Sequence, residues 1–306
     1  MSGFIVEGKC RLKGTIRVTG NKNEALPLIA ASLLCSGPVT FSNVPEIGDV
    51  ATMLSIASLL GAEISQLDNG RVTITVKKIV STELPLKESV AIRASILFAS
   101  ALLARKGRAV IRQPGGDSIG RRRLDTHFAV FQSLGARLRV ERKISPDGIA
   151  QETRFILTTP KGGLKGTTIH LDEASVTATE NALIAAAGAL GTTVIANAAS
   201  EPHVQGLCRF LQKCGVPVEG VGSNLLTVRG NRECRGADHE VGGDYIEAGS
   251  FIGLAAATGS ELAITGVHVR DLRMILHQFG RIGVSVDSDT DGGKLFVPRK
   301  QALRPN

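Results

Sequence analysis

The stretch 23–37, NEALPLIAASLLCSG, is an apolar helix-like segment that ends in a glycine, and its pattern occurs four times in the chain. The other copies are RASILFASALLARKG at 93–107, TATENALIAAAGALG at 177–191 and YIEAGSFIGLAAATG at 245–259. Each is followed by a short β-like run, PVTFSN, RAVIRQ, TTVIAN or SELAIT. A second helical pattern then leads to another glycine, at Gly61, Gly135, Gly215 and Gly283. The two glycines are 24 residues apart in three copies and 28 in the second, which indicates four copies of one structural unit.

Each copy predicts the order strand, helix, strand, helix, strand, strand, because alternating runs such as 72–76 and 225–228 follow the second helix. The first helices have small apolar residues all round, which is typical of buried helices, and a glycine at their end matches a C-cap. One copy cannot bury such a helix, so we expect copies to pack around a shared axis with sheets outside. The predicted fold class is α/β, an inside-out barrel of repeated units in two domains.

The second copy carries its four extra residues in the loop PGGDSIG, 114–120, which is followed at once by RRRLD, 121–125. Glycines let backbone N–H groups approach an anion, and arginines supply charge and planar donor forks for phosphate or carboxylate. Asp117 is a lone acid among these groups. The alternative is a solvated turn with a basic flank, but the enlargement of an ordinary connection favours a functional loop.

The first helices of the copies open with polar or basic residues, at Lys22–Asn23, Arg93, Thr177 and Tyr245. Helix N-termini carry unpaired N–H groups and the positive end of the dipole, so several that converge on one axis predict an anion site. Acidic residues such as Glu180, Asp244 and Glu247 lie at the same ends. Helix capping is the favoured interpretation for Glu247, whereas for Asp244 capping and a functional role stay equally open.

Composition bounds the remaining possibilities. A chain of 306 residues with 43% hydrophobic residues can form two cores, and no apolar run approaches the roughly 18 residues of a membrane span. The five cysteines form no C-x-x-C pair, which argues against a disulfide framework and a zinc site and favours the cytoplasm. The net charge of +8 is compatible with nucleic acid, but stacking platforms are scarce, because there is no tryptophan and one tyrosine. An anionic small molecule fits the charge as well.

Motifs along the chain resemble those of the UDP-N-acetylglucosamine 1-carboxyvinyltransferase family of enolpyruvyl transferases. They occur in the family's order, as GNKNEALP, NVP, RAS, PGGDSIG with RRRLD, SVTATEN, NAASEP and DYIEAG, over the chain to about Pro298. The G-S-K-S and G-N-A-G-T signatures of the sister enzyme that acts on shikimate 3-phosphate are absent.

The resemblance implies a two-domain protein of six such units, three in each domain, with the active site between the domains. One domain is residues 22–229, and the other combines residues 1–21 with 230–306. The implied reaction transfers the enolpyruvyl group of phosphoenolpyruvate to the 3′-hydroxyl of UDP-N-acetylglucosamine in the cytoplasm, at the start of peptidoglycan precursor synthesis. No cofactor, metal, nucleic acid or membrane is implied, and an oligomer is compatible with the pattern.

The resemblance also implies roles for individual residues, which fall into an acid, a set of cations and a set of substrate contacts. Lys22 and Arg122 match residues that hold the phosphate of phosphoenolpyruvate. Asp117 takes the place of the loop cysteine that most members carry. This replacement implies insensitivity to fosfomycin. The remaining matches are Asn23 for the sugar, Arg93 as an active-site arginine, Leu124 and Asp125 for uridine, Ser175, Val176 and Thr177 for the diphosphate, and Asp244 at the domain junction.

Departures from the family pattern keep other interpretations open. Thr177 replaces a usual glycine, Arg123 a usual proline and Tyr245 a usual arginine, and only about four of six copies are present. The family's second catalytic aspartate and further arginines would lie in the other two copies. The alternatives are an enolpyruvyl transferase for another nucleotide, a divergent or truncated non-catalytic nucleotide-sugar-binding paralogue, and an RNA 3′-terminal phosphate cyclase. The last would need a nucleotidyl-accepting histidine near the C-terminus, where the sequence shows no candidate.

Overall fold

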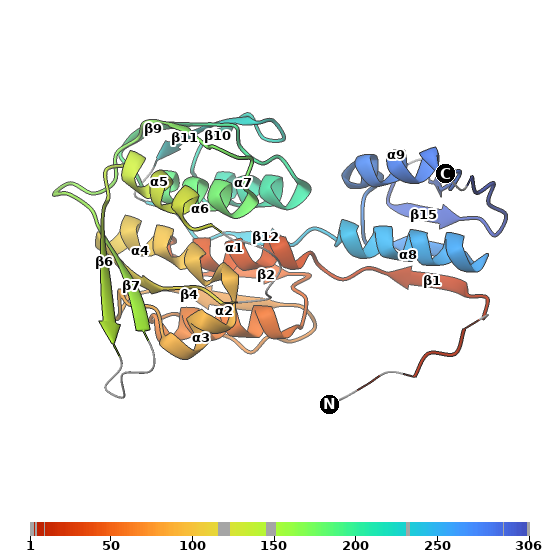
Figure 1. Cartoon of the computed structure of the whole chain (residues 1–306), viewed down its shortest axis with the longest axis horizontal. Coiled ribbons are helices and arrows are strands. Elements are labelled where there is room, and N and C mark those ends of the chain that lie inside the picture. Colours follow the sequence, from red (N-terminus) through yellow and green to blue (C-terminus); the bar gives the residue numbers. More distant parts are fainter. Residues whose placement is uncertain are drawn as a thin grey trace. The chain divides into compact units, whose positions relative to one another are not determined.

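The computed structural model describes residues 3, 5–8, 10–115, 123–144, 151–230, 233–289 and 291–304. They divide into two compact units, a larger unit from Lys22 to Val241 and a smaller one that combines Met1–Asn21 with Gly242–Asn306 (Figure 1). The expected change of domain at 230 therefore falls later, because a strand at Asp238–Glu240 pairs inside the larger unit. No helix in the described ranges is both long and apolar enough to pass through a bilayer.

The larger unit holds three copies of the repeated unit. The first copy contains α1 (Lys22–Ser32), β2 (Val39–Ser42), α2 (Gly48–Leu59), β3 (Glu63–Ile64) and β4 (Val72–Thr75). The second contains α3 (Leu86–Ala91), the 3-10 helix η1 (Arg93–Leu97), α4 (Phe98–Lys106), β5 (Arg108–Arg112), α5 (Asp125–Ser133), β6 (Arg137–Ile144) and β7 (Gln151–Thr158). The third contains β8 (Thr168–His170), α6 (Val176–Ala187), β9 (Gly191–Ala196), α7 (Pro202–Lys213), β10 (Val218–Glu219) and β11 (Leu225–Gly230), and β12 (Asp238–Glu240) follows it.

The smaller unit holds the fourth copy. Its elements are β1 (Lys13–Arg17), α8 (Tyr245–Thr258), β13 (Glu261–Thr265), the 3-10 helix η2 (Val269–Leu272), α9 (Arg273–Arg281), β14 (Asp287–Ser288) and β15 (Lys294–Val297).

The sheets confirm the expected strand order within a copy. The third copy has the order β8-β9-β11-β10, in which the first pair is parallel and the others are antiparallel. The sheets β12-β2-β4-β3 and β1-β13-β15-β14 repeat this order. The first strands of copies one and four are exchanged, because β1 precedes α1 but pairs with β13, while β12 precedes α8 but pairs with β2. The chain therefore passes twice between the two units.

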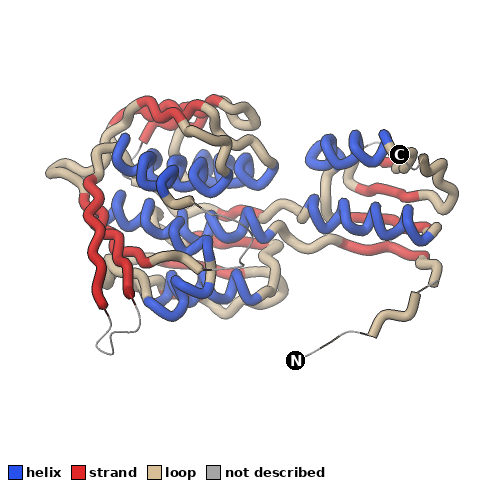
Figure 2. Tube along the Cα trace, viewed as in Figure 1, coloured by secondary structure: helices blue, strands red, loops and turns tan. Residues whose placement is uncertain are grey.

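The first helices of the copies in the larger unit are buried, as their composition predicts. Every residue of α1 from Glu24 to Ser32 and every residue of α6 from Ala178 to Ala187 is buried. Figure 2 shows these helices in the middle of the unit, with the β6–β7 hairpin and the β9–β11 sheet at its periphery. This packing removes both faces of each helix from water, which a single copy could not do.

The glycine C-caps are confirmed in two copies and wrong in the other two. Gly107 and Gly259 follow α4 and α8 directly in the left-handed conformation. The helix α1 ends at Ser32, before Gly37, whose missing side chain allows the backbone nitrogen of Gly236 to approach to 3.3 Å of an ideal Cβ position. In the third copy the cap is Gly188, three residues earlier than expected.

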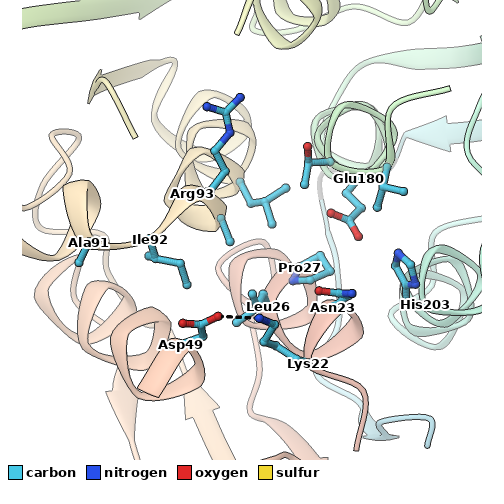
Figure 3. Close-up of a pocket in the computed structure, with 14 residues that line it drawn as sticks. Lys22, Asn23, Leu26, Pro27, Asp49, Ala91, Ile92, Arg93, Glu180 and His203 are labelled. Atoms are coloured by element: carbon cyan, nitrogen blue, oxygen red, sulfur yellow. Dashed lines mark hydrogen bonds and ion pairs between the residues drawn. The ribbon is translucent and has the colours of Figure 1, made fainter. Parts of the chain in front are cut away.

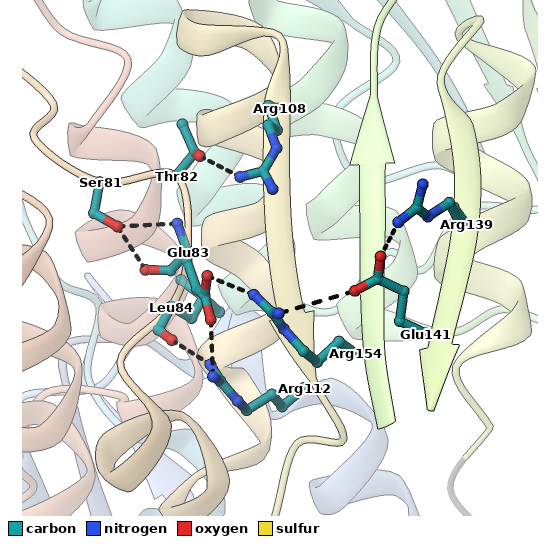
Figure 4. A network of polar contacts seen from close by, with 9 residues as sticks. All are labelled: Ser81, Thr82, Glu83, Leu84, Arg108, Arg112, Arg139, Glu141 and Arg154. Carbon is teal, nitrogen blue, oxygen red and sulfur yellow. Dashed lines mark hydrogen bonds and ion pairs between the residues drawn. The ribbon is translucent and has the colours of Figure 1, made fainter. Parts of the chain in front are cut away.

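An ion-pair network joins the sheet of the second copy to Glu83, in the segment before α3 (Figure 4). Glu83 forms a single parallel bridge with Val110 of β5, where the other copies have a full first strand. Its carboxylate accepts hydrogen bonds from Arg112 at 2.8 Å and from Arg154 of β7 at 2.7 Å. Because all three side chains are at least half-buried, this network fastens the connection before α3 to the sheet.

Among its described residues, the smaller unit exposes an apolar face. The helix α9 has no buried residue, and Met274 on it is 71% exposed. A groove of about 500 Å³ runs along α8 and α9 and is lined mainly by apolar residues such as Ile246 and Phe279. In the larger unit the helix α6 is covered by neighbouring copies, whereas the fourth copy has no second copy in its own unit.

Candidate functional site

A cavity of about 420 Å³ lies where the first helices of the larger unit begin (Figure 3). It is lined by the first residues of α1, η1 and α6, which are three of the helix ends that the sequence predicts to converge. Five of the predicted site residues lie together in its wall, namely Lys22, Asn23, Arg93, Val176 and Thr177. The convergence of positive helix ends and two cations makes the cavity suited to an anion.

Lys22 is held at the mouth of the cavity by an ion pair. Its Nζ lies 2.9 Å from Oδ2 of Asp49, a residue in the first turn of α2, and the dashed line in Figure 3 marks this contact. Both side chains are a little over 40% exposed, so water screens the pair and it contributes little to stability. The pair instead orients the ammonium group at the cavity. Sequence reasoning missed Asp49, because an acid in the first turn of a helix is an ordinary feature.

Arg93 connects the cavity to the segment that leads into α5. Its Nη2 donates a hydrogen bond to the backbone oxygen of Arg123 at 2.7 Å. The side chain of Arg123 in turn forms an ion pair with Asp125, the first residue of α5. This guanidinium lowers the pKa of Asp125, and both side chains are a little over half exposed. Leu124 is buried beside them, so the two predicted uridine-binding residues lie next to Arg93's partner rather than in the wall of the cavity.

Ser175 caps the helix that brings Val176 and Thr177 to the cavity. Its Oγ accepts a hydrogen bond from the N–H of Ala178 at 3.4 Å, and its carbonyl accepts one from the hydroxyl of Thr179 at 2.8 Å. This serine is therefore engaged in forming the helix end. The other N–H groups of the first turn have no acceptor within the helix, so they can donate hydrogen bonds to an anion.

Glu180 and His203 also line the cavity, and sequence reasoning did not assign either of them to a site. Glu180 is 2% exposed, and its Oε1 has no hydrogen-bond partner within the described part of the chain. Burial raises the pKa of Glu180 well above its ordinary value, and the nearby Glu201 carboxylate raises it further. The group is therefore neutral over a range of pH in which an exposed glutamate is ionised.

A buried hydrogen-bond network lies behind the cavity. Asn181, which follows Glu180, accepts a hydrogen bond from the hydroxyl of Ser100 on α4, and its Nδ2 lies 2.8 Å from Nδ1 of His127 on α5. Burial lowers the pKa of His127 to about 4, and the positive charge of Arg93 acts in the same direction. The imidazole is therefore neutral at pH 7, with Nδ1 as the acceptor for the amide of Asn181.

The three remaining predicted site residues are Asp117, Arg122 and Asp244. Asp117 and Arg122 lie outside the described residues. Asp244 belongs to the smaller unit, where its Oδ1 accepts hydrogen bonds from the N–H groups of Ile246 and Glu247 and caps α8. The carboxylate of Glu247 accepts hydrogen bonds from the backbone N–H and the hydroxyl of Thr19. The favoured interpretation of Glu247 as a helix cap is therefore replaced by a contact to Thr19, which lies in the connection between β1 and α1.

The described residues contain no cluster of three or more His, Cys, Asp or Glu side chains that could hold a metal ion. All five cysteines are free thiols, and Sγ of Cys35 lies 3.7 Å from Sγ of Cys214. Burial raises the pKa of Cys208 and Cys234 to about 12, so these buried thiols are poor nucleophiles at neutral pH.

Comparison with known proteins places the chain among carboxyvinyl transferases. The sequence model of the EPSP synthase (3-phosphoshikimate 1-carboxyvinyltransferase) family matches residues 6–303. The chain is 46% identical over its whole length to the UDP-N-acetylglucosamine 1-carboxyvinyltransferase of Treponema denticola, of which it covers 68%. It is 47% identical to the protein of that name from Treponema pallidum, over 93% of the chain and 64% of the relative. The chain thus spans about two thirds of the length of these relatives.

Solved structures show the same fold. The enolpyruvyl transferase of Streptomyces tendae matches 96% of the chain and 68% of its own length, with a TM-score of 0.78 and 25% identity. An EPSP synthase from Acinetobacter baumannii matches 97% of the chain and 66% of its own length, with a TM-score of 0.70. At 22% identity, that second likeness concerns the fold alone.

Proposed function

This chain belongs to the family of UDP-N-acetylglucosamine 1-carboxyvinyltransferases, and we propose from this membership that it transfers the enolpyruvyl group of phosphoenolpyruvate to the 3′-hydroxyl of UDP-N-acetylglucosamine. The structural observation that carries the proposal is the gathering of Lys22, Asn23, Arg93, Val176 and Thr177 around one cavity. Their cations and helix N-termini suit two substrates that are both phosphate esters. The reaction would begin peptidoglycan precursor synthesis in the cytoplasm.

The residues divide into phosphate contacts and contacts to the nucleotide sugar. Lys22 and Arg122 hold the phosphate of phosphoenolpyruvate, and the Asp49 carboxylate keeps the Lys22 ammonium at the cavity until the phosphate arrives. The first turn of α6, capped by Ser175, offers N–H groups to the diphosphate. Asn23 contacts the sugar.

The uridine contacts come from the start of α5, and Asp244 contributes from the smaller unit. Leu124 and Asp125 follow the segment that Arg93 fastens, so an arginine at the cavity also positions the uridine-binding residues. We assign no metal or organic cofactor to the reaction, because its chemistry requires only an acid, a base and positive charge.

The chemistry is an addition followed by an elimination. Asp117 protonates the methylene carbon of phosphoenolpyruvate while the sugar hydroxyl, losing its proton to a base, bonds to the adjacent carbon. The adduct then loses inorganic phosphate and a methyl proton, which restores the enol double bond. Asp117 can act as the acid only if burial raises its pKa far above about 3.9. Cations around the leaving phosphate stabilise its developing charge.

We also extend the proposal to the fold. The three copies of the larger unit form a closed inside-out barrel, and the smaller unit is one copy of a second such domain. The burial of α1 and α6 on all sides supports closure, because an open sheet with helices on its two faces would expose part of each helix.

The direct test is the release of inorganic phosphate from phosphoenolpyruvate, measured with and without UDP-N-acetylglucosamine. We expect release that depends on the nucleotide sugar and is lowered at least ten-fold in Lys22→Ala, because a charge-assisted contact to phosphate contributes about 1.5–3 kcal/mol. Lys161→Ala is the matched control, since Lys161 is an exposed lysine in the turn before β8. If the chain binds both substrates but releases no phosphate, this proposal is wrong and a nucleotide-sugar-binding function replaces it.

A further inference from the structure

Glu180 is the most unusual group in the wall of the cavity. It lies one turn into α6, is 2% exposed, and has an Oε1 without a hydrogen-bond partner among the described residues. Figure 3 shows that it projects from α6 on the side of the cavity where Asn23 and His203 lie. A buried carboxyl oxygen without a partner costs free energy, so a residue in this state at a cavity is a candidate for contact with a ligand.

The groups around Glu180 have opposing charges. Glu201, the residue before α7, is the acid that acts on it most directly, and His203 of α7 lines the same cavity. Lys22 of α1 and Arg93 of η1 are the cations of the cavity wall, and Asp49 of α2 is paired with Lys22. Burial, and secondly the Glu201 carboxylate, raise the pKa of Glu180.

An ionised Glu180 would repel the anion that the rest of the cavity attracts, whereas a neutral carboxylic acid can donate a hydrogen bond to it. We propose that Glu180 is a substrate-binding residue whose protonated carboxyl group donates a hydrogen bond to a phosphate oxygen of the bound substrate. This inference rests on the proposed function, because that function supplies phosphate-bearing substrates. It assigns to Glu180 a role that requires the proton and not only the shape of the side chain.

Two substrates carry phosphate, so the test has two arms. Calorimetry measures the affinity of UDP-N-acetylglucosamine alone, from pH 5.5 to 9. It then measures the affinity of phosphoenolpyruvate in the presence of the analogue of the nucleotide sugar that lacks the 3′-hydroxyl, because this analogue cannot react. The arm in which Glu180 variants change affinity identifies the phosphate that it contacts. Glu180→Gln keeps the size and a neutral donor, and Glu180→Ala removes the donor. Glu219→Gln on β10 is the matched control, because that glutamate is exposed.

We expect Glu180→Ala to weaken one of the two ligands roughly ten- to hundred-fold, as the loss of a hydrogen bond to a charged group does. Glu180→Gln should bind within a few-fold of the wild type at pH 6. The ratio of wild-type to Glu180→Gln affinity should fall as pH rises, because only the wild type loses its proton. Taking this ratio removes the ionisation of the phosphate itself, whose second pKa is about 6.

Equal affinities of the wild type and Glu180→Ala in both arms would overturn the inference. So would identical pH profiles of the wild type and Glu180→Gln, a result that does not depend on how well the alanine variant folds. Either result with intact binding by the wild type would leave the proposed function standing. A wild-type protein that binds neither substrate would overturn the proposed function and this inference together.

Discussion

Acidification should destabilise the larger unit through one buried histidine. His127 is 2% exposed, and its Nδ1 faces the Asn181 side-chain amide at 2.8 Å. Protonation would turn this acceptor into a donor that opposes the amide, at a buried position. The pKa of His127 is accordingly lowered from 6.5 to about 4 by burial and, secondly, by Arg93. A difference of this size corresponds to about 3 kcal/mol.

The sign of the effect follows from proton binding. Below pH 6.5 the unfolded chain binds a proton at this histidine that the folded chain does not bind until about pH 4. The stabilising contribution of the neutral imidazole is therefore fully present above pH 6.5 and is lost as pH falls towards 4. We expect the free energy of unfolding to decrease by about 3 kcal/mol over this window from this residue alone.

Urea unfolding followed by circular dichroism between pH 7.5 and 4 measures this loss, since the chain has no tryptophan and one tyrosine for fluorescence. His127→Gln removes the titrating group, so its stability should fall less steeply with acid than that of the wild type. The difference between the two proteins isolates His127, because they share every other titrating group. His170→Gln, at an exposed position on β8, is the matched control and should follow the wild type. Parallel curves for the wild type and His127→Gln would refute the reasoning.

The remaining predictions concern packing, the polar network and the active-site loop. Gly206→Ala should destabilise the protein by about 1–3 kcal/mol in thermal unfolding, because its Cβ would meet the Glu24 carboxyl carbon at 2.2 Å. The control is Gly280→Ala, whose Cβ would meet nothing within 4 Å, and it should be neutral or stabilising by up to about 1 kcal/mol. Glu83→Gln should lower the free energy of unfolding in urea by about 1–2 kcal/mol, because two arginines lose their shared charge, and an unchanged stability would count against the network. Fosfomycin should leave the mass of the intact protein unchanged, because the Asp117 carboxylate is a weaker nucleophile than a thiolate, whereas Asp117→Cys should be labelled; a stoichiometric adduct on the wild type would contradict this.

The repeats made much of the fold predictable. Equal spacing between glycines indicated copies of one unit, and small apolar residues all round α1 and α6 indicated that these helices are buried. The exchange of β1 and β12 between copies could not be seen, because a strand's sequence records which face is apolar but not which neighbouring sheet supplies its hydrogen bonds. The early end of α1 was missed for a similar reason, since Gly37 is required by the nearby backbone of Gly236 rather than by a helix end.

The candidate site was predictable where residue type and position act together. Polar or basic residues at three helix starts indicated a shared anion site, and the structure brings Lys22, Arg93 and Thr177 to one cavity. The sequence could not distinguish Glu180 from an ordinary glutamate near a helix end, because its raised pKa arises from burial between copies. That burial is a property of the assembled unit, and no local pattern around α6 reports it.

The most direct test of the account is identification of the reaction product by mass spectrometry. The chain is incubated with phosphoenolpyruvate and UDP-N-acetylglucosamine, and in parallel with the analogue of the sugar that lacks the 3′-hydroxyl. The account predicts an enolpyruvyl ether of the nucleotide sugar in the first reaction and none in the second. Absence of the ether from the first reaction, under conditions in which both substrates bind, would contradict the claim that this chain is a carboxyvinyl transferase.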